Sequence, residues 1–112
     1  MPYVPDRGDI VYINFSPQSG HEQANRRPAL VLSPILYNAA AGLAVVVPIT
    51  SRVRGQRFEV ALPASLATRG VILSDHLKSM DWHARKAIFK ETAPDAIVDE
   101  VIARVAALLQ LT

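Results

Sequence analysis

Helical periodicity is confined to the end of the chain, and this restricts the fold more than any other feature. The segment 92–112, TAPDAIVDEVIARVAALLQLT, repeats apolar residues at the spacing of one helix face. Those residues are Ile97, Val98, Val101, Ile102, Val105, Leu108 and Leu109. Thr92 and Asp95 have the spacing of a capping box, and Pro94 is tolerated in a first helical turn. We therefore predict an amphipathic helix packed on a core built from other elements.

The segments before this helix have the character of short strands separated by loops. β-branched and aromatic residues dominate them, and alternation or continuous apolar runs replace the helical period. The expected strands cover 9–15, 28–33, 43–50, 57–62, 70–80 (one strand, or two bent near Asp75) and 87–91. Pro28 is expected to be the first residue of its strand, where a missing N–H costs no ladder bond. A turn region with room for one helical turn, closed by Gly42, is expected at 33–42.

Short strands followed by one helix indicate a small barrel or curled sheet rather than βαβ units. The 112 residues fit a single domain spanning 1–112, and the composition, half hydrophobic and a fifth charged, is that of a folded soluble protein. The longest apolar run, 43–49, is too short to cross a bilayer, and the N-terminus lacks the apolar region of a secretory signal. A cytoplasmic location is therefore expected.

Polar groups gather in the segment 16–27, SPQSGHEQANRR, which leads into an apolar strand. Twelve residues are many for a hairpin connection, and long structured loops are often functional. Five of the nine arginines also lie within 26–57, although the net charge is only +2. They are Arg26, Arg27, Arg52, Arg54 and Arg57. Guanidinium groups bind phosphate oxygens in a bidentate way, so these residues form either a phosphate-binding surface or an ordinary solvated one.

Several kinds of catalytic site find no support in the sequence. His21, His76 and His83 are scattered and lack metal-binding spacing, and the absence of Cys removes thiol nucleophiles and thiolate ligands. No serine lies on a glycine-flanked elbow, and neither GxxxxGKT nor GxGxxG is present. Two possibilities remain, namely chemistry on a phosphodiester without metal or cofactor, and binding alone.

RNA suits such a site because its 2′-hydroxyl is already next to the phosphate. The protein then has to remove one proton, donate another and stabilise the added negative charge. Glu22, Arg27 and Thr50 are the side chains that the sequence offers for this work. Arg27 and Thr50 lie at the ends of neighbouring expected strands, so we expect the fold to bring them to one rim.

Two motifs in fixed order resemble a known family. They are E-Q-x-x-x-R-P-A at 22–29 and P-x-T-S at 48–51, and the flanking segments extend the likeness over nearly the whole chain. The chain resembles the MazF/PemK-like toxins of bacterial toxin–antitoxin pairs. The resemblance implies an SH3-like barrel of the CcdB/MazF type with short helical insertions, usually a homodimer. It also implies a sequence-selective endoribonuclease that cleaves single-stranded mRNA without metal, leaving 2′,3′-cyclic phosphate and 5′-hydroxyl ends.

The resemblance further implies roles for individual residues and a partner. The family's catalytic arginine and threonine match Arg27 and Thr50, and an acidic residue of its first loop matches Glu22. Arg27 is expected either to transfer a proton or to bind the scissile phosphate, and the second role is favoured because a guanidinium keeps its proton at neutral pH. Glu22 is expected to orient Arg27 or to accept the 2′-proton. Thr50 is expected to donate a hydrogen bond to a phosphate oxygen. The implied partner is a MazE-like antitoxin whose acidic, disordered tail occupies the RNA groove.

Reading of bases and contact with the RNA backbone are expected from a larger set of polar residues. The set is Gln23, Asn25, Arg26, Ser51, Arg52, Arg54, Arg57, Asp75, His76, Lys78 and Arg85. His76 stands where the family often has glutamine, and a ring with one donor and one acceptor cannot copy an amide, so the target motif is left open. Trp82 is expected in the core or at a dimer interface.

Two other classes remain open at this point. Gyrase-poisoning toxins of the same fold act by binding a protein, and they would use the C-terminal residues without needing Arg27 or Thr50. A non-catalytic SH3-like module would need an exposed aromatic groove, and Phe, Tyr and Trp total only seven here. Both classes predict that RNA stays intact.

Overall fold

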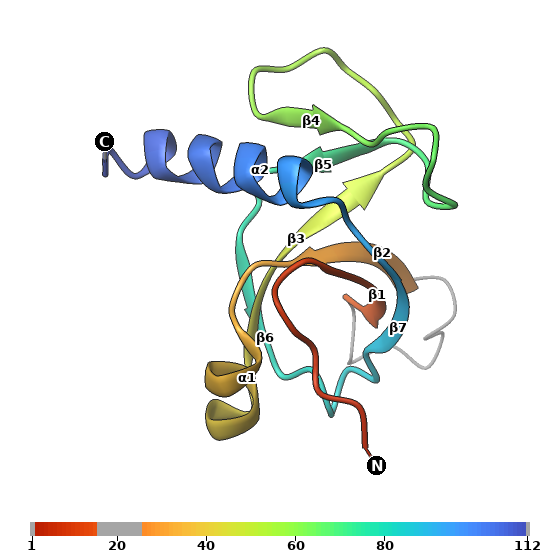
Figure 1. Cartoon of the computed structure of the whole chain (residues 1–112), viewed down its shortest axis with the longest axis vertical. Coiled ribbons are helices and arrows are strands. Elements are labelled where there is room, and N and C mark those ends of the chain that lie inside the picture. Colours follow the sequence, from red (N-terminus) through yellow and green to blue (C-terminus); the bar gives the residue numbers. More distant parts are fainter. Residues whose placement is uncertain (1, 16–25, 112) are drawn as a thin grey trace.

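The computed structural model describes residues 2–15 and 26–111, and it arranges them as seven strands and two helices (Figure 1). The strands are β1 (Asp9–Asn14), β2 (Arg26–Val31), β3 (Ala44–Thr50), β4 (Glu59–Ala61), β5 (Val71–Leu73), β6 (Lys78–Met80) and β7 (Ile88–Thr92). The helices are α1 (Ile35–Ala41) and α2 (Asp95–Leu108). Neither helix of the described part is long and apolar enough to cross a membrane.

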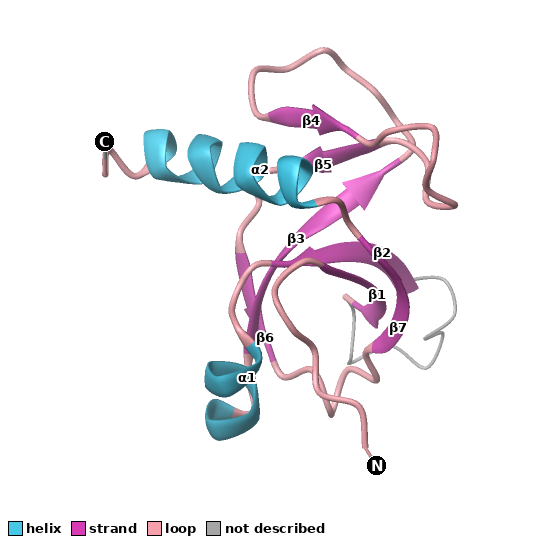
Figure 2. Ribbon diagram, in the orientation of Figure 1, coloured by secondary structure: helices cyan, strands magenta, loops and turns pink. Residues whose placement is uncertain are grey.

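All strand pairs are antiparallel, in the order β4-β5-β3-β2-β1-β7, and β6 also pairs with β3. The predicted mainly-β fold with a C-terminal helix is confirmed, and the sheet curls strongly, as Figure 2 shows. The hydrogen-bonded path is open, with β4 and β7 as its two ends. α2 lies across the sheet beside β4 and β5, whereas α1 lies at the opposite end of the molecule (Figure 1).

β3 changes partners along its length, and this change produces the bend. Its first half pairs with β6 from Ala44 to Val46, and its last two residues, Ile49 and Thr50, pair with β5. Its other edge pairs with β2 from Val46 to Pro48 only. The end of β3 therefore leaves β2 and joins the β4–β5 hairpin, which opens the sheet between β2 and the tip of β3.

The curled sheet buries apolar residues on both of its faces. Ile10, Leu30, Val47 and Ile49 pack with Val98 and Val101 of α2, all with at most 7% exposure. The other face forms a second cluster, made of Val11, Ile13, Ala29, Val31, Ala44, Val46 and Met80. Burial on both faces explains why the central strands β2 and β3 have continuous apolar runs rather than alternation.

Three expectations from the sequence need correction. Pro28 is the third residue of β2, where it pairs with Tyr12 of β1, and it is tolerated because β2 has no β3 partner at that level. The N-cap of α2 is Pro94 without a side-chain cap, because Thr92 is held in β7 by pairing with Asp9. The 33–42 segment holds a helix of seven residues, which is longer than the single turn expected there. Gly42 closes it as expected, in the left-handed conformation.

Trp82 packs against the core, which was one of the two positions expected for it. Its ring packs on the second apolar cluster, and its indole N–H donates to the carbonyl of Asn38 at 2.9 Å. Asn38 is fully buried, and its side-chain amide donates to the carbonyls of Pro5 and Ser33. The side-chain amide of Asn38 therefore ties α1 to the N-terminal segment, and its backbone carbonyl ties α1 to the turn after β6.

Candidate active site

Arg27 and Thr50 lie where the sheet opens between β2 and β3. The last register pair toward that opening is Ala29 with Pro48. Continued by two residues, the same register sets Arg27 opposite Thr50, and opposite residues of antiparallel strands point to the same face. The backbone therefore delivers a guanidinium and a hydroxyl to one rim, as the sequence predicted.

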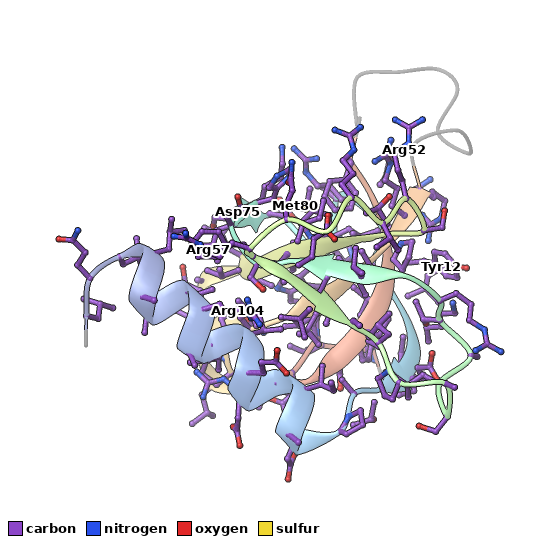
Figure 3. All side chains as sticks on the ribbon, turned by 90° about the horizontal axis from the view of Figure 1, so that it is seen from above. Tyr12, Arg52, Arg57, Asp75, Met80 and Arg104 are labelled. Atoms are coloured by element: carbon purple, nitrogen blue, oxygen red, sulfur yellow. The ribbon has the colours of Figure 1, made fainter. Side chains whose placement is uncertain are left out.

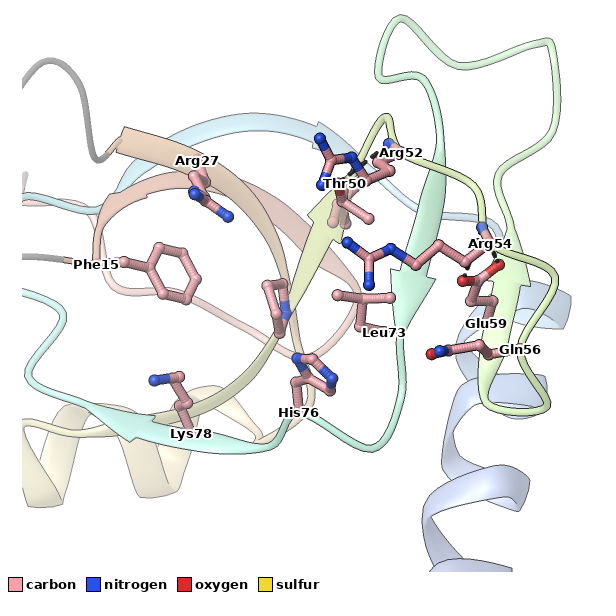
Figure 4. A pocket seen from close by; sticks show the side chains of 12 residues that line it. Phe15, Arg27, Thr50, Arg52, Arg54, Gln56, Glu59, Leu73, His76 and Lys78 are labelled. Atoms are coloured by element: carbon pink, nitrogen blue, oxygen red, sulfur yellow. Dashed lines mark hydrogen bonds between the residues drawn. The ribbon is translucent and has the colours of Figure 1, made fainter.

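A cavity of about 610 Å³ opens at this rim (Figure 4). It is lined by Phe15, Arg27, Pro48, Ile49, Thr50, Arg52, Arg54, Gln56, Glu59, Leu73, His76 and Lys78. Figure 4 shows Arg27 and Phe15 on one side, Arg52 and Arg54 on the other, and His76 and Lys78 between them on a third wall. Six of the residues predicted for the site thus meet around one space: Arg27, Thr50, Arg52, Arg54, His76 and Lys78.

The charge around this cavity is strongly positive. Four cationic side chains line it, and Glu59 is the one carboxylate among the lining residues that the structure describes. That carboxylate is already engaged, because it accepts the N–H of Arg54 at 3.1 Å and that of Gly55 at 2.9 Å. Converging cations in a concave site raise the local concentration of anions, and guanidinium forks fit phosphate oxygens. The cavity therefore has the chemistry of a phosphate-binding site.

The loop between β3 and β4 is held in place at three points. The Thr50 hydroxyl oxygen accepts the N–H of Arg52 at 3.1 Å, and Glu59 holds the middle of the loop. At the far end, the Arg104 guanidinium donates to the carbonyl of Arg57. These contacts fix the backbone that carries Arg52 and Arg54 at the edge of the cavity.

Gly70 places Thr50 through a close backbone approach. An added Cβ at Gly70 would lie only 2.0 Å from the Thr50 carbonyl oxygen and 2.9 Å from Cα of Ser51. The φ angle of Gly70 is +112°, which side-chain-bearing residues rarely adopt. Together with the pairing of Thr50 to Val71, this contact seats the tip of β3 directly on β5.

Other predicted site residues lie outside this cavity. The Arg26 guanidinium donates to the carbonyl of Lys86, and Arg85 donates to the carbonyls of Asn14 and Phe15, so both serve the backbone beside β1. Arg57 is exposed beside α2 and Arg104, as Figure 3 shows. Asp75 is exposed, with its carboxylate 3.7 Å from the His76 ring. Glu22, Gln23 and Asn25 lie outside the described residues.

Sequence reasoning missed several lining residues of the site. Phe15 continues the side of β1 that carries Val11 and Ile13, so strand alternation would have placed it on the rim with Arg27. The others are Gln56 in the loop before β4, Glu59 in β4 and Leu73 in β5, and no local pattern in the sequence marks them. Within the described ranges, no three His, Cys, Asp or Glu residues gather in a way that suits a metal ion.

The fold and site together define a small β protein with a preformed cationic cavity that carries a guanidinium and a hydroxyl at its mouth. The model of the PemK-like, MazF-like toxins of type II toxin–antitoxin systems matches residues 6–109. The chain belongs to this family.

Individual relatives agree over most of their length. The chain is 46% identical over 96 residues to an endoribonuclease toxin MazF of Escherichia coli K12, which spans 85% of this chain and 86% of the relative. A crystal structure of MazF from Deinococcus radiodurans superposes with a TM-score of 0.89 at 50% identity, covering 97% of this chain and 99% of that one. A MazE–MazF complex from the same organism superposes at 0.87 with 45% identity, covering 96% and 97%.

Proposed function

We propose that this chain is an endoribonuclease toxin that cleaves single-stranded mRNA at selected sequences without a metal ion. The observation that carries the proposal is the meeting of Arg27 and Thr50 at one cationic cavity, in a chain whose relatives are named endoribonucleases. The cavity supplies fixed donors and positive charge, which is what a phosphodiester needs when its own 2′-oxygen is the nucleophile.

In the proposed reaction the 2′-oxygen loses its proton and forms a bond to phosphorus while the bond from phosphorus to the 5′-oxygen breaks. The 5′-oxygen takes up a proton, so the products are a 2′,3′-cyclic phosphate and a 5′-hydroxyl. Arg27 binds the non-bridging oxygens, and the Thr50 hydroxyl donates to one of them as negative charge builds. Glu22, which lies outside the described residues, remains our candidate for orienting Arg27 or accepting the 2′-proton.

The other two walls of the cavity are suited to reading and holding the strand. Arg52, Arg54 and Lys78 offer charged donors for backbone phosphates, and His76 presents an exposed ring within the same cavity. Splayed bases of single-stranded RNA are read on their edges by such side chains. Ser51 borders the neighbouring cavity described below, and Gln23 and Asn25 stay candidates for base reading.

Two partners belong to the proposal. The first is a MazE-like antitoxin, supported by the MazE–MazF complexes to which this chain is similar, and its acidic tail would compete with RNA for the cationic cavity. The second is another copy of this chain. Large apolar side chains that a partner surface would cover are exposed at α1 and at the end of α2: Ile35, Leu36, Tyr37, Leu108, Leu109 and Leu111.

Paired substitutions at the two catalytic positions test the proposal. Thr50→Val removes the hydroxyl while keeping the shape, and we expect cleavage of single-stranded RNA to fall about 10²–10³-fold. Thr50→Ser keeps the hydroxyl and should retain most activity. Arg27→Met should fall as far as Thr50→Val, and Arg27→Lys should recover only part, because a lysine cannot bind two oxygens as a fork. Full activity of both Thr50→Val and Arg27→Met, measured in EDTA, would refute the assignment.

A further inference from the structure

A second cavity adjoins the first on the other side of the Arg27–Thr50 pair. Its volume is about 440 Å³. It is lined by Tyr12, Arg27, Pro28, Ile49, Thr50, Ser51, Arg52, Thr68, Arg69 and Lys90. Four of these also line the first cavity: Arg27, Ile49, Thr50 and Arg52. The two proposed catalytic side chains therefore stand on the boundary between two cavities rather than at the end of one.

The new lining residues continue the positive charge. Arg69 and Lys90 bring two further cations, and in the described part of the chain neither lies within salt-bridge distance of a carboxylate. The Lys90 ammonium lies 4.8 Å from the centre of the Tyr12 ring, and the Lys90 side chain is half-buried at the edge of the cavity. Tyr12 itself is 38% exposed. The ammonium offers a contact to phosphate, and a base can stack on the Tyr12 ring once Lys90 turns toward that phosphate.

The loop that carries Arg69 is anchored before any ligand binds. The Glu91 carboxylate accepts the Thr68 N–H at 2.7 Å, the Thr68 hydroxyl at 2.5 Å and the Ala67 N–H at 3.0 Å. On the other side of Arg69, Gly70 lies against the Thr50 carbonyl. Arg69 thus sits between an anchor on β7 and an anchor on the tip of β3, and its guanidinium, which donates a long hydrogen bond of 3.5 Å to the carbonyl of Ala64, lines the cavity.

We propose that this second cavity is an RNA subsite that holds the nucleotide on the far side of the scissile phosphate from His76 and Lys78. The inference rests on the proposed endoribonuclease function and extends it. Arg69 and Lys90 bind the next backbone phosphate, and the Tyr12 ring supports its base. A strand that crosses the Arg27–Thr50 boundary has nucleotides on both sides of the cut, and the two cavities lie on these two sides.

Substrate truncation combined with substitution tests this subsite. Three oligonucleotides are compared once the cut position is known: a full one, one shortened on the 5′ side of the cut and one shortened on the 3′ side. The variant Arg69→Gln/Lys90→Gln should lower kcat/KM on the full substrate at least tenfold, because each lost charged contact is worth about that much. On one of the two shortened substrates, variant and wild type should become equal. Lys86→Gln removes a charge from a residue that lines neither cavity and should act equally on all three substrates.

The outcomes separate the subsite from the parent function. If the wild type cleaves the RNA but the ratio of variant to wild-type kcat/KM is the same on all three substrates, the subsite alone is overturned. A wild type that cleaves none of the three would overturn the endoribonuclease function and the subsite with it. A variant that cleaves RNA normally but loses binding to a polyglutamate peptide would make the cavity a protein-binding site, which also contradicts the inference. The salt dependence of RNA binding should weaken by about 0.7 in slope for each lost phosphate contact.

Discussion

Replacement of Gly70 by alanine tests how the protein seats Thr50. The added methyl carbon would lie 2.0 Å from the Thr50 carbonyl oxygen and 2.7 Å from its carbonyl carbon. Close carbon–oxygen contacts in proteins lie near 3.3 Å, so backbone rather than a flexible side chain would have to move by roughly 1 Å. The positive φ adds strain of about 1–3 kcal/mol, and overpacking adds about 1–3 kcal/mol. We expect Gly70→Ala to lose about 2–6 kcal/mol of unfolding free energy.

Gly42→Ala is the matched control. Gly42 has a φ of +71°, and a Cβ there would meet nothing within 4 Å, so only the backbone term of about 1–2 kcal/mol applies. Urea unfolding followed by circular dichroism at one protein concentration compares the two. Folded Gly70→Ala should also cleave RNA about 100-fold more slowly, because a 1 Å displacement of a catalytic group costs about that much. Equal unfolding free energies for the two variants, or full activity in Gly70→Ala, would refute the reasoning.

Two further predictions concern the carboxylates that hold the site's loops. Glu59→Gln weakens the hydrogen bonds that the N–H groups of Arg54 and Gly55 donate to this side chain. We therefore expect faster amide hydrogen exchange at these two residues and a higher KM for RNA with little change in kcat. Unchanged exchange would contradict this. The Thr68 hydroxyl and the N–H groups of Ala67 and Thr68 hold the pKa of Glu91 below its ordinary 4.5. Because the folded-state pKa is the lower one, this carboxylate stabilises the fold above pH 4.5, and the contribution disappears as pH falls through the folded value. Glu91→Gln should flatten the fall of unfolding free energy in acid, and an unaltered acid limb would contradict the assignment.

The architecture could be predicted because its signals are local. Apolar spacing at 92–112 marked α2, and short β-branched segments marked the strands, including the break near Asp75 that separates β5 from β6. The meeting of Arg27 with Thr50 also followed from the chain, because neighbouring antiparallel strands bring the start of one beside the end of the next. The sequence left only the register between β2 and β3 undetermined. Both faces of these strands are buried, so their apolar residues do not show which pairing is used, and the structure supplies it.

The sequence did not show which arginines line the cavities and which donate to backbone carbonyls instead. Arg26 and Arg27 were treated as one loop pair, but both belong to β2, and alternation along a strand sends their side chains to opposite faces. Arg85 finds its carbonyl partners at Asn14 and Phe15, some 70 residues earlier in the chain. Arg69 and Lys90 gained a place beside Thr50 only through β5 and β7, which no local pattern connects to the polar loop.

The nature of the nucleophile is the central claim, and one substitution in the substrate tests it directly. A single-stranded RNA that the protein cleaves is made again with one 2′-deoxy nucleotide immediately 5′ to the cut, and a second control carries the deoxy nucleotide one position further away. In EDTA, we predict complete loss of cleavage for the first and normal cleavage, with a 2′,3′-cyclic phosphate end, for the second. Undiminished scission of the first oligonucleotide would contradict attack by the substrate's own 2′-oxygen.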